Sequence, residues 1–158
     1  MRKSTRCQCA SSFLVHPTSD YGRIKALLDK GRHPTFVGRN LIRRCAMNGG
    51  CMVFSAGGRD VAGAVVNPAI NVLLVLNIHP DHRSHGLGGA ILDYLKCNFA
   101  RVLESAIPFF ARNGYQAVGA MHQGKRLRTQ VMIKSSLIPL AGRVAKLYAL
   151  YAQKDLTT

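Results

Sequence analysis

The sequence has no tryptophan, and only 7% of its 158 residues are aromatic. Proteins that bind single-stranded nucleic acid usually stack bases on aromatic side chains, so this composition does not indicate a base-stacking surface. The five cysteines form no C-x-x-C pair, and their odd number does not fit the disulfide framework of a small secreted protein. No run reaches the roughly 18 uncharged apolar residues that a membrane span needs. We therefore expect a soluble, cytoplasmic protein.

Acidic residues are also scarce, and the basic excess lies at the two ends. The chain has 22 Lys and Arg against 7 Asp and Glu, a net charge of +15. Residues 1–50 carry 10 basic and 2 acidic groups (+8), residues 51–121 carry 5 and 4 (+1), and residues 122–158 carry 7 and 1 (+6). Such a field attracts nucleic acid and other polyanions, although basic residues can also serve solubility alone.

The hydrophobic pattern predicts one α/β domain over residues 18–135. The expected helices lie between Asp20 and Gly31, near 36–47, from about Gly86 and over 106–112. The expected strands cover residues 52–54, 61–66, 72–78, 101–103, 115–121 and 129–135. The apolar run at 72–76 does not alternate, which is typical of a central strand covered on both faces. We expect residues 1–17 to be a mobile basic segment and residues 136–158 to form an amphipathic helix packed on the domain or extending it.

The most informative segment is the loop that follows this central strand. The strand ends at His79-Pro80, and a polar loop with Arg83 leads into the helix at Gly86. Unpaired amides at the positive end of a helix dipole suit a diphosphate, and Gly86 and Gly88 allow a ligand to approach the backbone. No Gly-Lys-Ser/Thr follows, which excludes the Walker pattern, and the third Rossmann glycine is replaced by Ile91.

Two motifs in this order resemble one known superfamily. Arg83-x-x-Gly86-x-Gly88, preceded by Ile78-x-Pro80, looks like the acyl-CoA diphosphate loop of the GNAT acetyltransferases. The segment from Ala106 to Tyr115 is similar to their A-x-x-F-Y-x-x-x-G-F segment, and the hairpin around 58–63 also fits. The resemblance covers residues 18–135. It implies an α/β fold with a mixed sheet, flanked by helices, that splays open between its fourth and fifth strands.

The resemblance also implies a cofactor and its binding residues. Acetyl-CoA or another acyl-CoA would enter the gap, with its pantetheine arm on the backbone of the fourth strand and its diphosphate on the loop. The expected cofactor-binding residues are Leu76, Ile78, Arg83, Ser84, His85, Gly86, Leu87, Gly88, Gly89 and Phe110. We expect no metal, because no carboxylate–histidine ligand spacing accompanies His79, His82 and His85. These histidines either bind phosphate or are exposed loop residues.

The catalytic residues are less clearly indicated. Phe110 stands where the superfamily often has the tyrosine that protonates the leaving thiolate, and Tyr115 is expected in the core. Glu104 and Ser105 follow the candidate fifth strand, and Asn77 lies on the fourth. These three are the catalytic candidates, although Glu104 also fits a carboxylate that faces solvent.

Two functions remain open from the sequence. The first is an N-acyltransferase that moves an acyl group from acyl-CoA to an amine. The basic ends favour an acceptor attached to or near nucleic acid, or an acidic protein partner, and a homodimer is left open. The alternative is a non-catalytic module on the same fold that binds CoA, nucleic acid or another protein.

Overall fold

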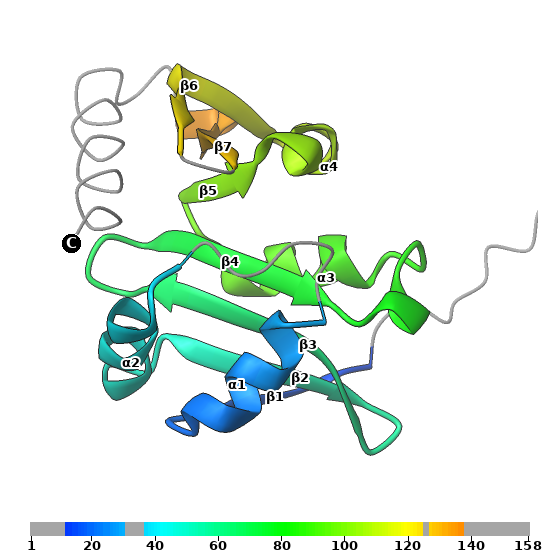
Figure 1. Cartoon of the computed structure of the whole chain (residues 1–158). Coiled ribbons are helices and arrows are strands. Elements are labelled where there is room, and N and C mark those ends of the chain that lie inside the picture. Colours follow the sequence, from blue (N-terminus) through cyan, green and yellow to red (C-terminus); the bar gives the residue numbers. More distant parts are fainter. Residues whose placement is uncertain (1–11, 31–36, 125–126, 138–158) are drawn as a thin grey trace, which may run out of the picture.

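The computed structural model describes residues 12–30, 37–124 and 127–137, and within them a seven-stranded mixed sheet carries helices on both faces (Figure 1). The strands are β1 (Leu14–Pro17), β2 (Cys51–Ala56), β3 (Arg59–Asn67), β4 (Val72–Ile78), β5 (Phe99–Leu103), β6 (Tyr115–Gln123) and β7 (Arg128–Lys134). The helices are α1 (Tyr21–Leu28), α2 (Arg39–Met47), α3 (Leu87–Leu95) and α4 (Ile107–Arg112). Three short 3-10 turns are η1 (Pro80–His82), η2 (Glu104–Ala106) and η3 (Ser135–Leu137). The strand order is β1-β2-β3-β4-β5-β7-β6.

One face of the sheet is covered by α1 and α2. The Asp20 side chain accepts a hydrogen bond from the Arg23 amide at 3.1 Å and so caps α1. The apolar stripes of α1 and α2 are buried in one core cluster. In this cluster Ile24, Ile42 and Leu74 are at most 1% exposed. The apolar residues that recur with the helical period therefore form the inner face of both helices.

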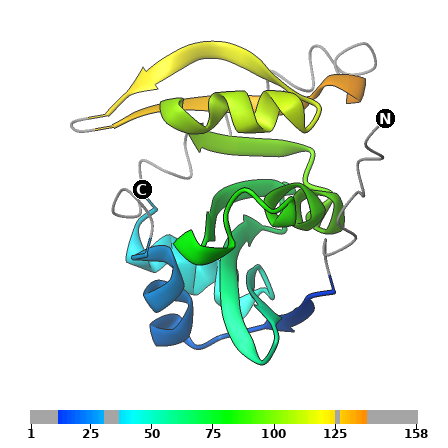
Figure 2. The same ribbon diagram turned by 90° about the vertical axis from the view of Figure 1, so that its right-hand side faces the viewer.

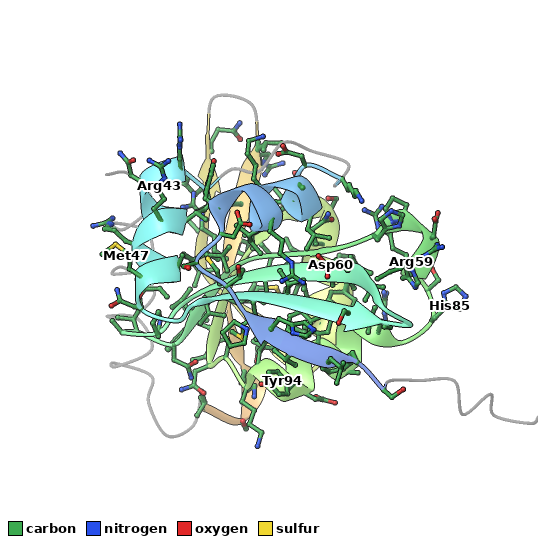
Figure 3. All side chains as sticks on the ribbon, turned by 90° about the horizontal axis from the view of Figure 1, so that it is seen from below. Arg43, Met47, Arg59, Asp60, His85 and Tyr94 are labelled. Carbon is green, nitrogen blue, oxygen red and sulfur yellow. The ribbon has the colours of Figure 1, made fainter. Side chains whose placement is uncertain are left out.

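The opposite face is covered by α3 and α4. Ile91 and Phe110 belong to a second core cluster that also contains Leu73. Figure 3 shows this division from below, with Arg43 of α2 on one side of the strands and Tyr94 of α3 on the other. Leu73 and Leu74, adjacent on β4, face different clusters and are both buried. The prediction of a central strand that is covered on both faces is therefore confirmed.

The contact between β4 and β5 is short. These strands run parallel and pair only at Val72–Phe99 and Leu73–Ala100. β4 also carries a bulge, because Leu73 pairs with Val66 and Val75 with Val65, leaving Leu74 as an extra residue. Beyond Leu73 the sheet divides into a β1–β4 block and a β5–β7 block, which Figures 1 and 2 show as separate layers of strands. The predicted splay is thus present.

The amino-terminal boundary differs from the prediction. Leu14–Pro17, expected within a mobile segment, forms β1 and pairs with β2 from Leu14–Ser55 to Pro17–Met52. The preceding Phe13 packs its ring edge-on against Phe54, with centroids 5.4 Å apart, which helps to hold this short edge strand. The domain therefore begins before residue 18.

The expected carboxy-terminal helix lies outside the described residues, apart from the first two of its residues, which belong to η3. Over the described ranges, each helix is too short or too polar to cross a lipid bilayer.

Candidate functional site

A cavity of about 710 Å³ lies where β4 and β5 separate. Its lining residues come from β4, β5, the loop before α3, the start of α3, η2 and α4. Of the expected cofactor residues, the following line it: Leu76, Ile78, Arg83, Ser84, Gly86, Gly88, Gly89 and Phe110. Leu87 is instead buried in the core, and His85 is exposed on the loop (Figure 3). The structure thus brings the predicted loop and the central strand to one site.

Arg83 ties the loop to the end of β4. Its Nε donates to the Ile78 carbonyl at 2.9 Å, and its Nη2 donates to Asn77 Oδ1 at 3.4 Å. The chain then turns through left-handed backbone conformations at Ser84 (φ 64°) and Gly86 (φ 79°), and α3 begins at Leu87. No atom lies within 4 Å of a Cβ placed on Gly86, so this glycine is required by its backbone angle. The first-turn amides of α3 open beside the cavity and lack helical acceptors.

Gly88 and Gly89 serve helix packing as well as the site. A Cβ at Gly88 would lie 2.8 Å from Phe109 Cζ and 2.9 Å from Ile78 Cδ1. A Cβ at Gly89 would lie 2.9 Å from Asn113 Oδ1. We expected Gly88 to admit the ligand, and the structure adds a second reason: it lets α3 pack closely against α4 and β4.

The three catalytic candidates, Ser105, Asn77 and Glu104, differ in whether they line the cavity and in their hydrogen-bond partners. Ser105, on η2, lines the cavity. Asn77 also lines it, but its Nδ2 donates to the Leu27 carbonyl at 2.6 Å while its Oδ1 accepts from Arg83. Its amide therefore holds β4, α1 and the loop together. Glu104 accepts from Arg128 at 2.9 Å in a half-exposed ion pair and is not among the residues that line the cavity.

Tyr115 is a core residue, as the sequence indicates. Its hydroxyl donates to the Cys97 carbonyl at 2.6 Å, and burial raises its pKa. The ring contacts Phe110 edge-on, with centroids 5.5 Å apart. A phenol held in this way is poorly placed to donate a proton in the cavity.

Arg101 is a site residue that the sequence analysis missed. It lines the cavity from β5, and its Nε donates to Thr129 Oγ1 at 3.1 Å. Burial lowers the pKa of its guanidinium, which nevertheless stays protonated at neutral pH. The signal available was a single charge inside the apolar strand Phe99–Leu103. Together with Arg83 and Arg112 it makes the described cavity lining cationic, since that lining contains no Asp or Glu.

The histidines near the loop take different positions. His82 lines the cavity, whereas the His79 ring accepts from the Asp81 amide at 3.2 Å and caps η1. Their ring centroids are 5.9 Å apart. Among the residues with described positions, no three His, Cys, Asp or Glu side chains gather in a way that would hold a metal ion.

Comparison with known proteins supports the fold. No family model and no curated protein matches the sequence. Solved structures do match, among them a GNAT-family acetyltransferase from Bacillus cereus, with a TM-score of 0.58 and 16% identity over 77% of this chain and 96% of that one. A polyamine N-acetyltransferase from Drosophila melanogaster matches with a TM-score of 0.54 and 14% identity over 77% and 98% of the two chains. N-acetylglutamate synthase from Neisseria gonorrhoeae, complexed with coenzyme A and N-acetylglutamate, matches with a TM-score of 0.53 and 14% identity over 78% and 35%.

These likenesses show that the chain has the fold of the GNAT acetyltransferases, as the two sequence motifs predict. Its α/β class and its splayed mixed sheet agree with that fold.

Proposed function

We propose that this protein is an N-acyltransferase that takes an acyl group from acetyl-CoA or another acyl-CoA and transfers it to an amine. The observation that carries the proposal is the cavity between β4 and β5, which is continuous with the loop that opens α3. A flexible thioester needs a channel through the sheet, and a diphosphate needs amides and positive charge at the entrance of that channel. The cavity between the two strands, with the glycines and Arg83 beside it, supports this assignment.

The cofactor would be held mainly by backbone. The diphosphate would accept hydrogen bonds from amides at the start of α3, near Gly86 to Gly89, with Arg83 supplying charge and bracing the loop. The pantetheine arm would follow β4 at Leu76 and Ile78, because in the described chain β4 has no paired residue on the β5 side beyond Leu73. Phe110 and the glycines would shape the wall.

The reaction requires few side chains. The neutral amine attacks the thioester carbonyl carbon, the new C–N bond forms, the C–S bond breaks, and the proton lost by the amine ends on the CoA sulfur. Holding the two reactants together supplies much of the rate. Ser105 supplies a hydroxyl on the cavity wall that can order a water or relay the proton, and Asn77 acts as a positioning residue through Leu27 and Arg83.

The acceptor is not decided by the fold. Among the structural neighbours, one enzyme acetylates polyamines and another forms N-acetylglutamate. An acceptor near nucleic acid or an acidic protein is supported by the net charge of +15 and by the exposed Arg39, Arg43 and Arg44 of α2. The guanidinium groups of Arg39 and Arg43 lie 5.2 and 5.3 Å from the centre of the Tyr21 ring. The cytoplasmic location and the homodimer stay predictions.

A non-catalytic CoA-binding module is the second candidate. Phe110 stands in place of the expected tyrosine, and the described cavity lining has no carboxylate to act as a base. Such a module would bind the cofactor as tightly but release no thiol.

Two measurements test the proposal. Acetyl-CoA should raise the melting temperature of the protein. The Arg83→Gln variant should need at least tenfold more acetyl-CoA for the same rise, because the substitution removes one charge beside the diphosphate. Arg59→Gln removes the same charge from an exposed residue at the start of β3 that is not among the cavity-lining residues, and it is the matched control. Release of CoA thiol with a panel of amines then separates an enzyme from a module. Absence of any stabilisation by acetyl-CoA or CoA would refute the proposal.

A further inference from the structure

We propose that the outward face of α2 binds the phosphate backbone of a double-stranded nucleic acid. This face consists of the exposed side chains of Arg39, Arg43 and Arg44, and we call it the α2 arginine face. Figure 3 shows Arg43 on the side of α2 that points away from the strands. The inference goes beyond the proposed function, because none of the three arginines lines the cavity. The face binds its partner whether or not the cavity transfers an acyl group.

The first argument is the contrast between α1 and α2. In α1 the basic side chains have acidic partners. Lys25 forms an ion pair with Asp29, one helical turn away. Arg23 pairs with Asp60 of β3 at 2.8 Å. Such mixed charges are typical of a helix face that is only solvated. α2 contains no acidic residue, and its arginines form no ion pair with a described acidic side chain.

This concentration of charge opposes the stability of α2 itself. Arg39 and Arg43 are one turn apart, and like charges at this spacing repel each other. Arg39 is also the first residue of α2, where the positive end of the helix dipole disfavours a cation. A bound polyanion supplies the negative charge that offsets both effects. A ligand therefore explains the three arginines better than solubility does.

The second argument is that two of these arginines are held in place. The guanidinium carbons of Arg39 and Arg43 lie 5.2 and 5.3 Å from the centre of the Tyr21 ring, at the start of α1. Cation–π contacts restrain these long side chains, so binding costs them less conformational entropy. The same contacts occupy the Tyr21 ring, which is then not free to stack a base. Contacts with backbone phosphates are therefore favoured over the base stacking that single strands require.

The third argument is the lack of an anchor for a protein partner. Tight protein interfaces centre on apolar or aromatic side chains that pack into pockets. Among the described residues of α2, Met47 is the one large apolar side chain that is exposed. The described hollow beside Arg44 has a volume of about 140 Å³, against about 710 Å³ for the cavity. A duplex needs no pocket, because it presents one phosphate charge per about 1.7 Å of its axis to exposed arginines.

The position of the face relates it to the cavity. α1 and α2 pack on the same face of the sheet, and Leu28, near the end of α1, is also among the cavity-lining residues. Tyr21 and Leu28 are separated by about 10 Å along the axis of α1. An amine carried by a duplex on the α2 arginine face would therefore approach the cavity from the α1 side.

The first experiment compares partners. Fluorescence anisotropy measures binding of an RNA duplex of about 20 base pairs, a DNA duplex of the same sequence and a poly-glutamate peptide, and co-sedimentation measures binding to vesicles that contain phosphatidylserine. At least one duplex should bind tenfold or more tightly than the peptide and the vesicles, and an unrelated sequence should bind within about threefold. The RNA and DNA arms identify the preferred duplex. A smaller preference over the peptide or the vesicles would overturn the choice of partner.

The second experiment locates the binding surface. Arg39→Gln/Arg43→Gln should lower the affinity for the duplex at least tenfold and reduce the slope of log K against log salt concentration by about 1.8. Arg59→Gln/Lys96→Gln removes two exposed charges outside α2, and Figure 3 shows Arg59 at the opposite end of the sheet from Arg43. This control should change the slope by less than about 0.5. Equal losses in the two double variants would show that net charge alone drives binding, and would refute the inference.

Two single variants complete the test. Arg44→Gln should reduce the slope by about one. Tyr21→Leu keeps every charge but releases Arg39 and Arg43, so it should weaken binding about threefold and leave the slope unchanged. Circular dichroism melting shows which variants are folded. Wild-type affinity in folded Arg39→Gln/Arg43→Gln and Arg44→Gln would overturn the inference.

Stabilisation by acetyl-CoA keeps the inference separate from the proposed function. Arg39→Gln/Arg43→Gln should retain this stabilisation, because neither residue lines the cavity. If acetyl-CoA stabilises the protein and the duplex does not bind through α2, the inference is wrong and the proposed function stands. If the duplex binds through α2 and acetyl-CoA does not bind, the proposed function is wrong and the inference stands.

Discussion

Gly88 offers a quantitative test of how α3 is seated beside the cavity. Alanine has a higher helix propensity than glycine, by about 1 kcal/mol, so an open helical site would be stabilised by Gly88→Ala. Here the new methyl would lie 2.8 Å from Phe109 Cζ and 2.9 Å from Ile78 Cδ1, well inside normal van der Waals separation. Overpacking of this kind costs about 1–3 kcal/mol. The collision outweighs the propensity gain, and we expect a net loss of about 1 kcal/mol.

The same collision predicts a specific partner. Phe109→Leu removes the atom nearest to the new methyl, so Gly88→Ala should cost about 1 kcal/mol less in that background than in the wild type. Urea unfolding followed by circular dichroism measures the four free energies of the cycle. Equal costs in both backgrounds would refute the packing argument. If Gly88→Ala left stability unchanged but abolished binding of acetyl-CoA, the glycine would serve the ligand alone.

Two further predictions concern groups outside the cofactor contacts. Glu104→Gln should change stability by less than about 1 kcal/mol and turnover by less than twofold, because Glu104 forms a half-exposed ion pair with Arg128; a tenfold loss of turnover would place Glu104 in catalysis. Burial raises the pKa of the Cys97 thiol from 9.0 to about 11, so above pH 9 the unfolded thiol ionises first and stability falls as pH rises. At pH 10 the wild-type protein should lose about 1 kcal/mol of its free energy of unfolding for this reason. In urea unfolding between pH 8 and 10.5, the stability of Cys97→Ala should fall less steeply than that of the wild type. An equally steep fall in the two proteins would exclude the Cys97 thiol as the cause.

Local patterns predicted most of the elements correctly. The Asp20 cap, the glycines of the β2–β3 turn and the apolar run of β4 each act through neighbouring residues in the chain. The left-handed angle at Gly86 and the start of α3 at Leu87 follow from the same local chemistry. For this reason the position of the loop was accessible to sequence reasoning, whereas the four-residue edge strand β1 was too short to give a periodic signal.

The functions of individual polar residues were not accessible in this way. Glu104 is paired with Arg128, 24 residues away. Asn77 is bonded to Leu27, 50 residues away, and Arg101 to Thr129, 28 residues away. The sequence pattern does not reveal which residues far apart along the chain become neighbours. For this reason Glu104 was expected in the site and Arg101 was not.

The sequence by itself determined most of the strands and helices, the position of the glycine-containing loop before α3, and the strongly positive charge. These properties follow from side-chain period, backbone angles and composition. The tertiary structure alone decided that β4 and β5 separate after one short contact, that a cavity opens there, and that Arg101 of β5 lines it. A hydrophobic pattern records which face of a strand is buried, whereas only the packed sheet determines which strand edge is left without a neighbour.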